Sequence, residues 1–85
     1  LPQGMEENLG STVTIFPNPA GEQINIAGAP AGSVVHLTDI SGKVLLRQEI
    51  IDTTTTLDVS AFPAGQYIIT IRSGNEVFRQ KVGKL

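Results

Sequence analysis

The feature that most constrains this chain is the alternation of short runs rich in Val, Ile, Leu and Thr with Gly, Pro, Asp, Asn and Ser. Such punctuation is typical of β-strands joined by tight turns. It predicts about seven strands, at residues 12–16, 22–27, 33–39, 43–50, 55–60, 66–72 and 76–82. No segment shows a convincing 3.6-residue period, and the runs follow one another too closely for helical crossovers. We therefore expect antiparallel strands packed as a β-sandwich.

Alternate residues within each run identify the side of the strand that faces the core, because successive side chains point to opposite faces. In the run at 66–72, only Ile68 interrupts a polar outer face, which predicts a central strand. His36 lies between two apolar residues and is expected on the solvent side. The fold class that follows is all-β, a small immunoglobulin-like antiparallel sandwich of about seven strands. The expected inward set is Ile24, Ile26, Val35, Leu37, Val44, Leu46, Ile50, Leu57, Val59, Tyr67, Ile69 and Ile71.

Composition limits what such a sandwich can do. With 85 residues and 40% hydrophobic content, the chain has room for one modest core. It has no Cys, so disulfides and thiolate metal sites are excluded. The net charge is -2 and the Lys and Arg residues are scattered, which argues against a nucleic-acid partner. No apolar run approaches the roughly 20 residues of a membrane-spanning helix, so direct membrane insertion is not expected.

The chain divides into two parts. Residues 1–11 mix Pro, Gly, Asn and charged residues without an apolar period, and we expect a linker there from an upstream domain. Residues 12–85 form the β-domain. Because the first residue is Leu1 rather than Met, we take the sequence to be a fragment of a longer protein.

Two glycine-containing turns have predictable chemistry. Between Asp39 and Lys43, an Asp that can bond the backbone two residues on precedes Gly42, which can adopt positive φ. We expect a type I turn with a G1 bulge that closes a hairpin. In the segment at 62–67, a Pro and Gly65 set a bend before Tyr67, whose ring is expected in the core and whose hydroxyl can bond back across the bend.

A third turn is built from proline. It consists of Phe16, Pro17, Asn18 and Pro19. Both prolines lack an N–H and push the preceding residue toward extended backbone, so this stretch can continue neither a central strand nor a helix. We expect a rigid crossing from one sheet edge to another, with Phe16 in the core or at its rim.

The order of these motifs resembles a known family. Residues 16–19, 39–44, 57–60 and 63–67 are followed by a basic strand and the C-terminal Lys84 and Leu85. Each motif is common alone, but four in this order within one short domain resemble the type A C-terminal sorting domain of type IX (Por) secretion cargo in Bacteroidetes. The match runs from about Ile15 to the last residue. Phe16 stands where the family more often has Tyr.

The resemblance implies a transport role, and we expect neither an enzymatic activity nor a cofactor. In this family the domain directs an upstream cargo from the periplasm across the outer membrane, for attachment to the cell surface or release. The implied partners are the outer-membrane translocon, a shuttle protein and a surface sortase-like cysteine peptidase. The implied recognition residues are Gly83, Lys84 and Leu85, which we expect to leave the sheet after Val82. The family motif residues, read as structural, are Phe16, Pro17, Asn18, Pro19, Asp39, Gly42, Lys43, Gly65 and Tyr67.

Other functions are less well supported by the residues. His36, Asp39 and Ser41 are the residue types of a hydrolase triad, but turn chemistry explains the last two. A lone His with dispersed carboxylates gives no metal-ligand spacing. The main alternative is an accessory carbohydrate- or protein-binding module of an extracellular enzyme, although the chain has no Trp, one Tyr and three Phe. A structural spacer is a third.

Two surface features are left open. The segment at 52–54 resembles a Bacteroidetes O-glycosylation sequon, with Thr53 as the acceptor. Arg79, Lys81 and Lys84 make the C-terminal strand locally basic within an acidic chain. This basic segment is interpreted either as a solvated edge that discourages strand pairing or as a docking surface.

Overall fold

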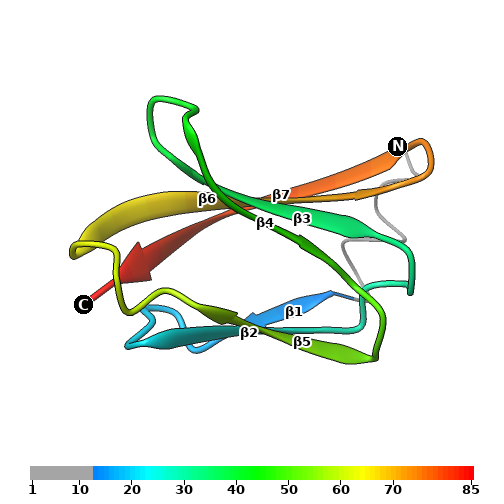
Figure 1. Cartoon of the computed structure of the whole chain (residues 1–85), viewed down its shortest axis with the longest axis horizontal. Helices are drawn as coiled ribbons and strands as arrows, with labels where there is room; N and C mark the ends of the chain where they lie inside the picture. Colours follow the sequence, from blue (N-terminus) through cyan, green and yellow to red (C-terminus); the bar gives the residue numbers. More distant parts are fainter. Residues whose placement is uncertain (1–12) are drawn as a thin grey trace.

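The computed structural model describes residues 13–85. This part of the chain contains seven strands and no helix. A sheet of three strands in the order β1-β2-β5 faces a sheet of four in the order β4-β3-β6-β7 (Figure 1). Every strand pair is antiparallel, and β6 lies between β3 and β7, so the sandwich and the central position of the sixth strand are confirmed. The predicted linker at 1–11 lies outside the described residues. The strands are β1 (Thr14–Phe16), β2 (Gln23–Ala27), β3 (Val34–Asp39), β4 (Val44–Glu49), β5 (Thr54–Asp58), β6 (Gly65–Ser73) and β7 (Glu76–Lys84).

The core lies between the two sheets and is built from alternate residues of the strands. Ile69 and Ile71 on β6 are fully buried, and Tyr67 is 7% exposed. The predicted inward faces of β2, β3, β5 and β6 are thereby confirmed. The buried apolar set is Val13, Ile15, Ala20, Ile24, Ile26, Ala29, Val35, Leu37, Ile50, Leu57, Val59, Tyr67, Ile69, Ile71 and Val82.

The predicted inward face of β4 is wrong at one end. Val44 is 53% exposed, whereas Leu45 and Leu46 both pack partly buried against the core. The cause is a β-bulge: Leu37 pairs with Leu46, but the next residue on β3 pairs with Val44, so β4 contains one extra residue. Simple alternation therefore breaks at this point, and the side chain of Val44 lies on the solvent face.

Phe16 also differs from expectation. Its neighbour Ile15 is 7% exposed and occupies the inward position of β1, so Phe16 points outward and is 43% exposed. The segment that follows is not a crossing between sheet edges, because it joins β1 to β2, which are adjacent strands of one sheet. The other two phenylalanines, Phe62 and Phe78, pack partly buried against the core.

No helix long and apolar enough to cross a membrane occurs within residues 13–85.

Candidate functional site

The motif residues gather at one end of the sandwich. Asp39, Tyr67 and Val82 lie side by side across β3, β6 and β7. Two residues farther toward the end of the β6–β7 ladder, Gly65 pairs with Lys84. The β1–β2, β3–β4 and β5–β6 loops and the C-terminus all lie at this end, at the left of Figure 1. We call it the motif end and define it by residues 16–21, 39–43, 59–65 and 83–85. Motifs far apart in the sequence therefore form one surface region.

The β3–β4 turn is organised by a single carboxylate oxygen. Asp39 Oδ1 accepts hydrogen bonds from the Ser41 N–H at 2.9 Å, the Ser41 hydroxyl at 2.6 Å and the Lys43 N–H at 3.0 Å. The Gly42 N–H donates to the Asp39 carbonyl at 3.0 Å, and Gly42 has a φ of 97°. The predicted hairpin and the positive φ are confirmed. In this arrangement Asp39 and Ser41 have turn-forming roles.

Replacing Gly42 by valine is expected to lower the free energy of unfolding by about 1–3 kcal/mol, because a β-branched residue adopts positive φ poorly. A Cβ at this position meets no heavy atom within 4 Å, so the loss comes from backbone strain and not from a clash. Ser41→Ala is the control and should change stability by less than about 1 kcal/mol. Denaturant unfolding measures both. Equal midpoints for the two variants would show that the positive φ contributes nothing to stability.

Hydrogen bonds lower the pKa of two turn carboxylates. For Asp39 the main causes are the bond from the Ser41 hydroxyl and then that from the Lys43 N–H. Asp58 is arranged in the same way: its Oδ1 accepts from the Ser60 hydroxyl at 2.7 Å and from the Ser60 N–H at 3.0 Å, and these bonds lower its pKa. Each carboxylate accepts these hydrogen bonds in its ionised form, so protonation of Asp39 or Asp58 weakens the turn that it stabilises.

Acid is therefore expected to destabilise the domain through these two turns. A folded-state pKa below the ordinary value of 3.8 gives stability that is present above that value and is lost as the pH falls through the lower folded-state pKa. Thermal unfolding followed from about pH 6 down to about pH 2.5 measures the loss. The Asp39→Asn, Asp58→Asn double variant should lose less stability below about pH 4 than the unmodified chain does. Parallel curves for the two proteins would contradict this assignment.

The β5–β6 turn has the predicted bond from the tyrosine. The Tyr67 hydroxyl donates to the carbonyl of Pro63, four residues earlier. The Tyr67 ring also lies against Phe62, with ring centroids 6.3 Å apart and planes tilted by 39°. Gly65 begins β6 with a φ of 151° and pairs with Lys84 on β7. The side chain of Tyr67 thus joins the turn to the core beside the C-terminal strand.

The proline-rich turn holds the C-terminal strand. The Asn18 side chain accepts a hydrogen bond from the Gly83 N–H at 3.1 Å and donates to the Lys81 carbonyl at 3.5 Å. The Ala20 N–H donates to the Gly83 carbonyl at 2.8 Å, and the Ala20 carbonyl accepts from the Leu85 N–H at 2.9 Å. Ala20 and Lys84 form an isolated parallel bridge. We call these contacts the C-terminal clamp.

The expectation that the chain leaves the sheet after Val82 is therefore wrong. β7 continues to Lys84, with Gly83 paired to Gln66 and Lys84 paired to Gly65. Gly83 does not end the strand, because it has a β6 partner on one side and the C-terminal clamp on the other. Only the Leu85 side chain, 76% exposed, projects freely into solvent.

Sequence reasoning missed the role of Asn18 and Ala20, although one signal was present. Pro17 and Pro19 have no N–H to donate, so the Asn18 side chain and the Ala20 N–H are among the few donors that this turn can offer to a strand. The partner strand lies more than sixty residues away in sequence, and local patterns do not identify it.

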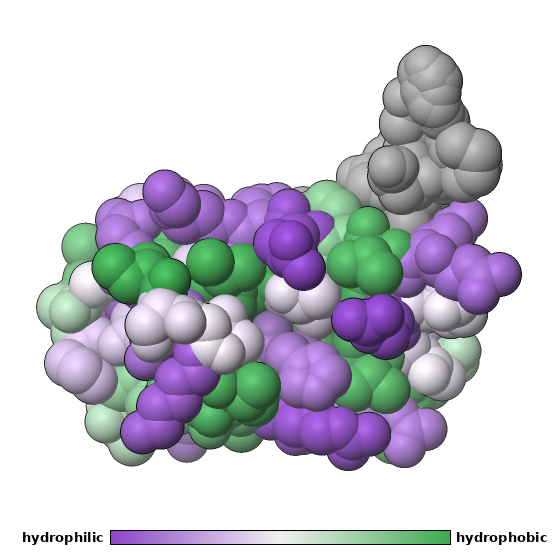
Figure 2. Space-filling model, turned by 90° about the horizontal axis from the view of Figure 1, so that it is seen from above, coloured by the Kyte–Doolittle hydropathy of each residue, from purple (hydrophilic) through white to green (hydrophobic). Residues whose placement is uncertain are grey.

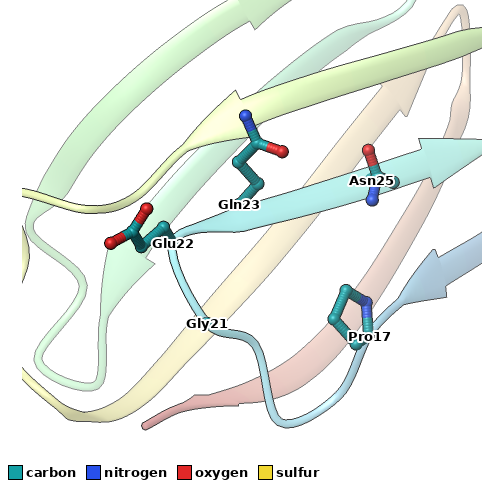
Figure 3. A pocket seen from close by; sticks show the side chains of 5 residues that line it. All are labelled: Pro17, Gly21, Glu22, Gln23 and Asn25. Atoms are coloured by element: carbon teal, nitrogen blue, oxygen red, sulfur yellow. The ribbon is translucent and has the colours of Figure 1, made fainter.

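A shallow hollow lies beside this turn on the three-stranded sheet (Figure 3). Its volume is about 450 Å³, and it is lined by Pro17, Gly21, Glu22, Gln23 and Asn25. The exposed Phe16 pairs with Asn25 across the β1–β2 ladder. The hollow is therefore polar, with an aromatic side chain on the adjacent strand.

The remaining candidate residues are dispersed. His36 is partly buried on the outward side of β3, and it pairs with Arg47 and Thr70. Thr53, the acceptor of the predicted glycosylation sequon, is exposed just before β5, and its carbonyl accepts a bond from the Gly28 N–H at 3.1 Å. Within residues 13–85, no group of three or more His, Asp or Glu side chains is placed to hold a metal ion.

Comparisons with solved structures agree on the fold. Over 94% of its length the chain superposes on 12% of PorZ from Porphyromonas gingivalis, an essential bacterial surface component of the type-IX secretion system, with a TM-score of 0.80 and 20% identity. Over 99% of its length it superposes on 93% of a DUF3244 family protein from Bacteroides vulgatus with an immunoglobulin-like β-sandwich fold, with a TM-score of 0.74 and 18% identity. No curated protein matches the chain.

At these identities the two structures establish the fold, and the sequence itself establishes the family. The family model for the secretion system C-terminal sorting domain matches residues 14–84, which include every strand of the sandwich and all of the motif end except Leu85. The chain belongs to the secretion system C-terminal sorting domain family.

Proposed function

We propose that this domain directs an upstream cargo protein across the outer membrane by the type IX secretion system, for attachment to the cell surface or release. The family match over residues 14–84 is the observation that carries the proposal. PorZ, which has a similarly folded region, is a surface component of that system, and this likeness agrees with the proposal. The proposed partners are the outer-membrane translocon, a shuttle protein and a surface sortase-like cysteine peptidase, and the proposed route passes through the periplasm.

The motif end is the proposed recognition region, and its tail residues Gly83, Lys84 and Leu85 are the proposed contacts with the translocon. The C-terminal clamp supports this view, because it holds the tail in one conformation and leaves the Leu85 side chain exposed. A preformed surface binds a partner without the entropy loss of ordering a loose peptide. The backbone of the tail is occupied by hydrogen bonds, so a partner would read side chains and the shape of the motif end.

A reporter fusion tests the proposal. Residues 1–85 are fused to the C-terminus of a periplasmic reporter in a bacterium that has a type IX system, and in a matched strain lacking the translocon. Surface or medium delivery in the first strain and periplasmic accumulation in the second is the expected result. Periplasmic accumulation in both strains, with the fusion intact and folded, would reject the sorting role for this chain.

A second candidate is a carbohydrate-binding module, and one observation favours it. The exposed Phe16 and the polar hollow beside it combine an aromatic face with Asn, Gln and Glu side chains, which are groups that sugar-binding sites use. A glycan array with the unmodified chain and with Phe16→Ala tests this role. Glycan binding that depends on Phe16 would support the carbohydrate-binding role. An array without signal would reject it.

A further inference from the structure

The outward face of the four-stranded sheet is basic. The buried residues of β3, β6 and β7 define the inward positions, so the alternate residues point away from the core. These outward positions and their partners on β4 include Arg47, Arg72, Arg79 and Lys81, all exposed, against the single carboxylate of Glu49. Four cations and one carboxylate leave a charge of +3 on this face. We call it the basic face.

The register brings these cations together. Arg47, His36, Thr70 and Arg79 form one row across β4, β3, β6 and β7. Neighbouring strands are about 4.8 Å apart, so the row spans roughly 15 Å. Arg72 and Lys81 belong to the adjacent rows on either side. At physiological salt the screening length is about 8 Å, so neighbouring members of this group act on an approaching charge together.

The other sheet has the opposite character. Among the described residues, its outward positions contain no cation and have the carboxylate of Asp58; they are Thr14, Phe16, Gln23, Asn25, Ala27, Thr54, Thr56 and Asp58. The whole chain has a net charge of -2. The chain has fewer Lys and Arg than Asp and Glu residues. The positive charge of the basic face therefore comes from the positions of the cations in the sheet and not from the overall composition.

Apolar side chains lie between the cations. Val34, Ile68 and Val77 are half-buried on the same face, and the space-filling view shows hydrophobic patches interleaved with hydrophilic side chains over this sheet (Figure 2). Tyr67 and Phe78 point to the other side of the sheet, so the basic face offers no stacking platform for nucleic-acid bases. Its short, half-buried aliphatic side chains also give little to insert into a lipid bilayer.

We propose that the basic face docks an acidic protein surface, with carboxylates of the partner between the arginines and its apolar side chains over Val34, Ile68 and Val77. β6 and β7 each have nine residues, so the face is about 30 Å long, and with four strands it is roughly 20 Å wide. Because β3 and β4 have only six residues each, the area is at most roughly 600 Å², which is below the ~800 Å² that each partner buries in a stable complex. The docking is therefore transient and salt-dependent. It is independent of the tail, which lies at the motif end.

Nuclear magnetic resonance titration of the full 85-residue chain with poly-L-glutamate, a soluble polypeptide anion, tests the proposal. We expect the largest shift changes at outward residues of β3, β6 and β7, with affinity at least ten-fold lower at 0.5 M salt than at 50 mM. Arg79→Glu should weaken binding at least ten-fold. Lys43→Glu is the matched control, because it makes the same change in net charge in the β3–β4 turn, and it should weaken binding less than three-fold.

Two further arms keep the result decisive. Arg79→Gln combined with Lys81→Gln removes charge without reversing it, and it should also weaken binding at least ten-fold, with the thermal midpoint unchanged. Vesicles of phosphatidylcholine and phosphatidylglycerol should bind more weakly than poly-L-glutamate at equal anion concentration. The proposal is overturned if the shifts centre on β1, β2 and β5, if Lys43→Glu and Arg79→Glu weaken binding equally, or if the vesicles bind as well as the polypeptide does.

Discussion

Replacement of Ile69 by alanine is expected to lower the free energy of unfolding by about 2–5 kcal/mol. Ile69 is fully buried on the central strand β6, between β3 and β7, and alanine would leave a cavity that two flanking strands prevent from closing. Domains of this size are stable by about 5–15 kcal/mol, so the change removes a large share of the total. Chemical denaturation measures it as a lower midpoint with an unchanged slope.

Ile51→Ala is the matched control, because it makes the same chemical change where the side chain is 73% exposed, just after β4. Its effect should stay within about 0.5 kcal/mol. If the two variants unfold at the same denaturant concentration, Ile69 does not belong to the core and the inward face of β6 is assigned wrongly. If Ile69→Ala fails to fold, Ile69→Val provides a milder version, with an expected loss of about 0.5–1.5 kcal/mol.

Local chemistry was enough to predict most of the fold. Alternation identified Ile24 and Ile69 as inward because each lies in a strand without a bulge, where every second side chain points to the core. The Asp39 turn was predictable for a similar reason: an Asp and a Gly at fixed offsets determine both the hydrogen bonds and the backbone conformation. In these cases the cause of the structure lies within a few residues.

The errors arose where the cause was not local. Val44 was predicted to face inward because no residue in its own strand indicates that β4 has one extra residue between Val44 and Leu46. Phe16 ends a strand of three residues, which is too short for alternation to decide its face. Gly83 was interpreted as an exit from the sheet, yet its partners, Gln66 and the clamp residue Asn18, are supplied by two distant segments.

The candidate site follows the same division. The family motifs could be recognised one by one in the sequence, but their meeting at one end of the sandwich is a property of strand order. Because β3, β6 and β7 are neighbours, Asp39, Tyr67 and Val82 lie side by side. The basic face was only partly foreseen: Arg79 and Lys81 were noted as a basic strand, whereas Arg47 and Arg72 join them through the register of the sheet.

Deletion of residues 83–85 is expected to destabilise the domain by about 2–4 kcal/mol, contrary to the expectation of a loose tail. The deletion removes two pairs from the β6–β7 ladder, Gln66 with Gly83 and Gly65 with Lys84. It also removes three hydrogen bonds of the C-terminal clamp, at 2.8, 2.9 and 3.1 Å, two of which involve the fully buried Ala20. Each bond contributes roughly 0.5–1.5 kcal/mol. Thermal unfolding of the truncated and complete chains measures the difference.

Because the deletion weakens the fold, a loss of export after truncation would not identify the tail as a recognition element. Lys84→Gln and Leu85→Ser separate the two effects, since both keep every backbone bond of the clamp and change side chains that are partly or largely exposed. Together they should alter stability by less than about 1 kcal/mol. If the translocon reads these side chains, a reporter fused to the double variant accumulates in the periplasm while the domain unfolds at its normal temperature. Normal delivery of that reporter would assign the tail a structural role as the last segment of β7, and recognition would then have to lie elsewhere on the domain.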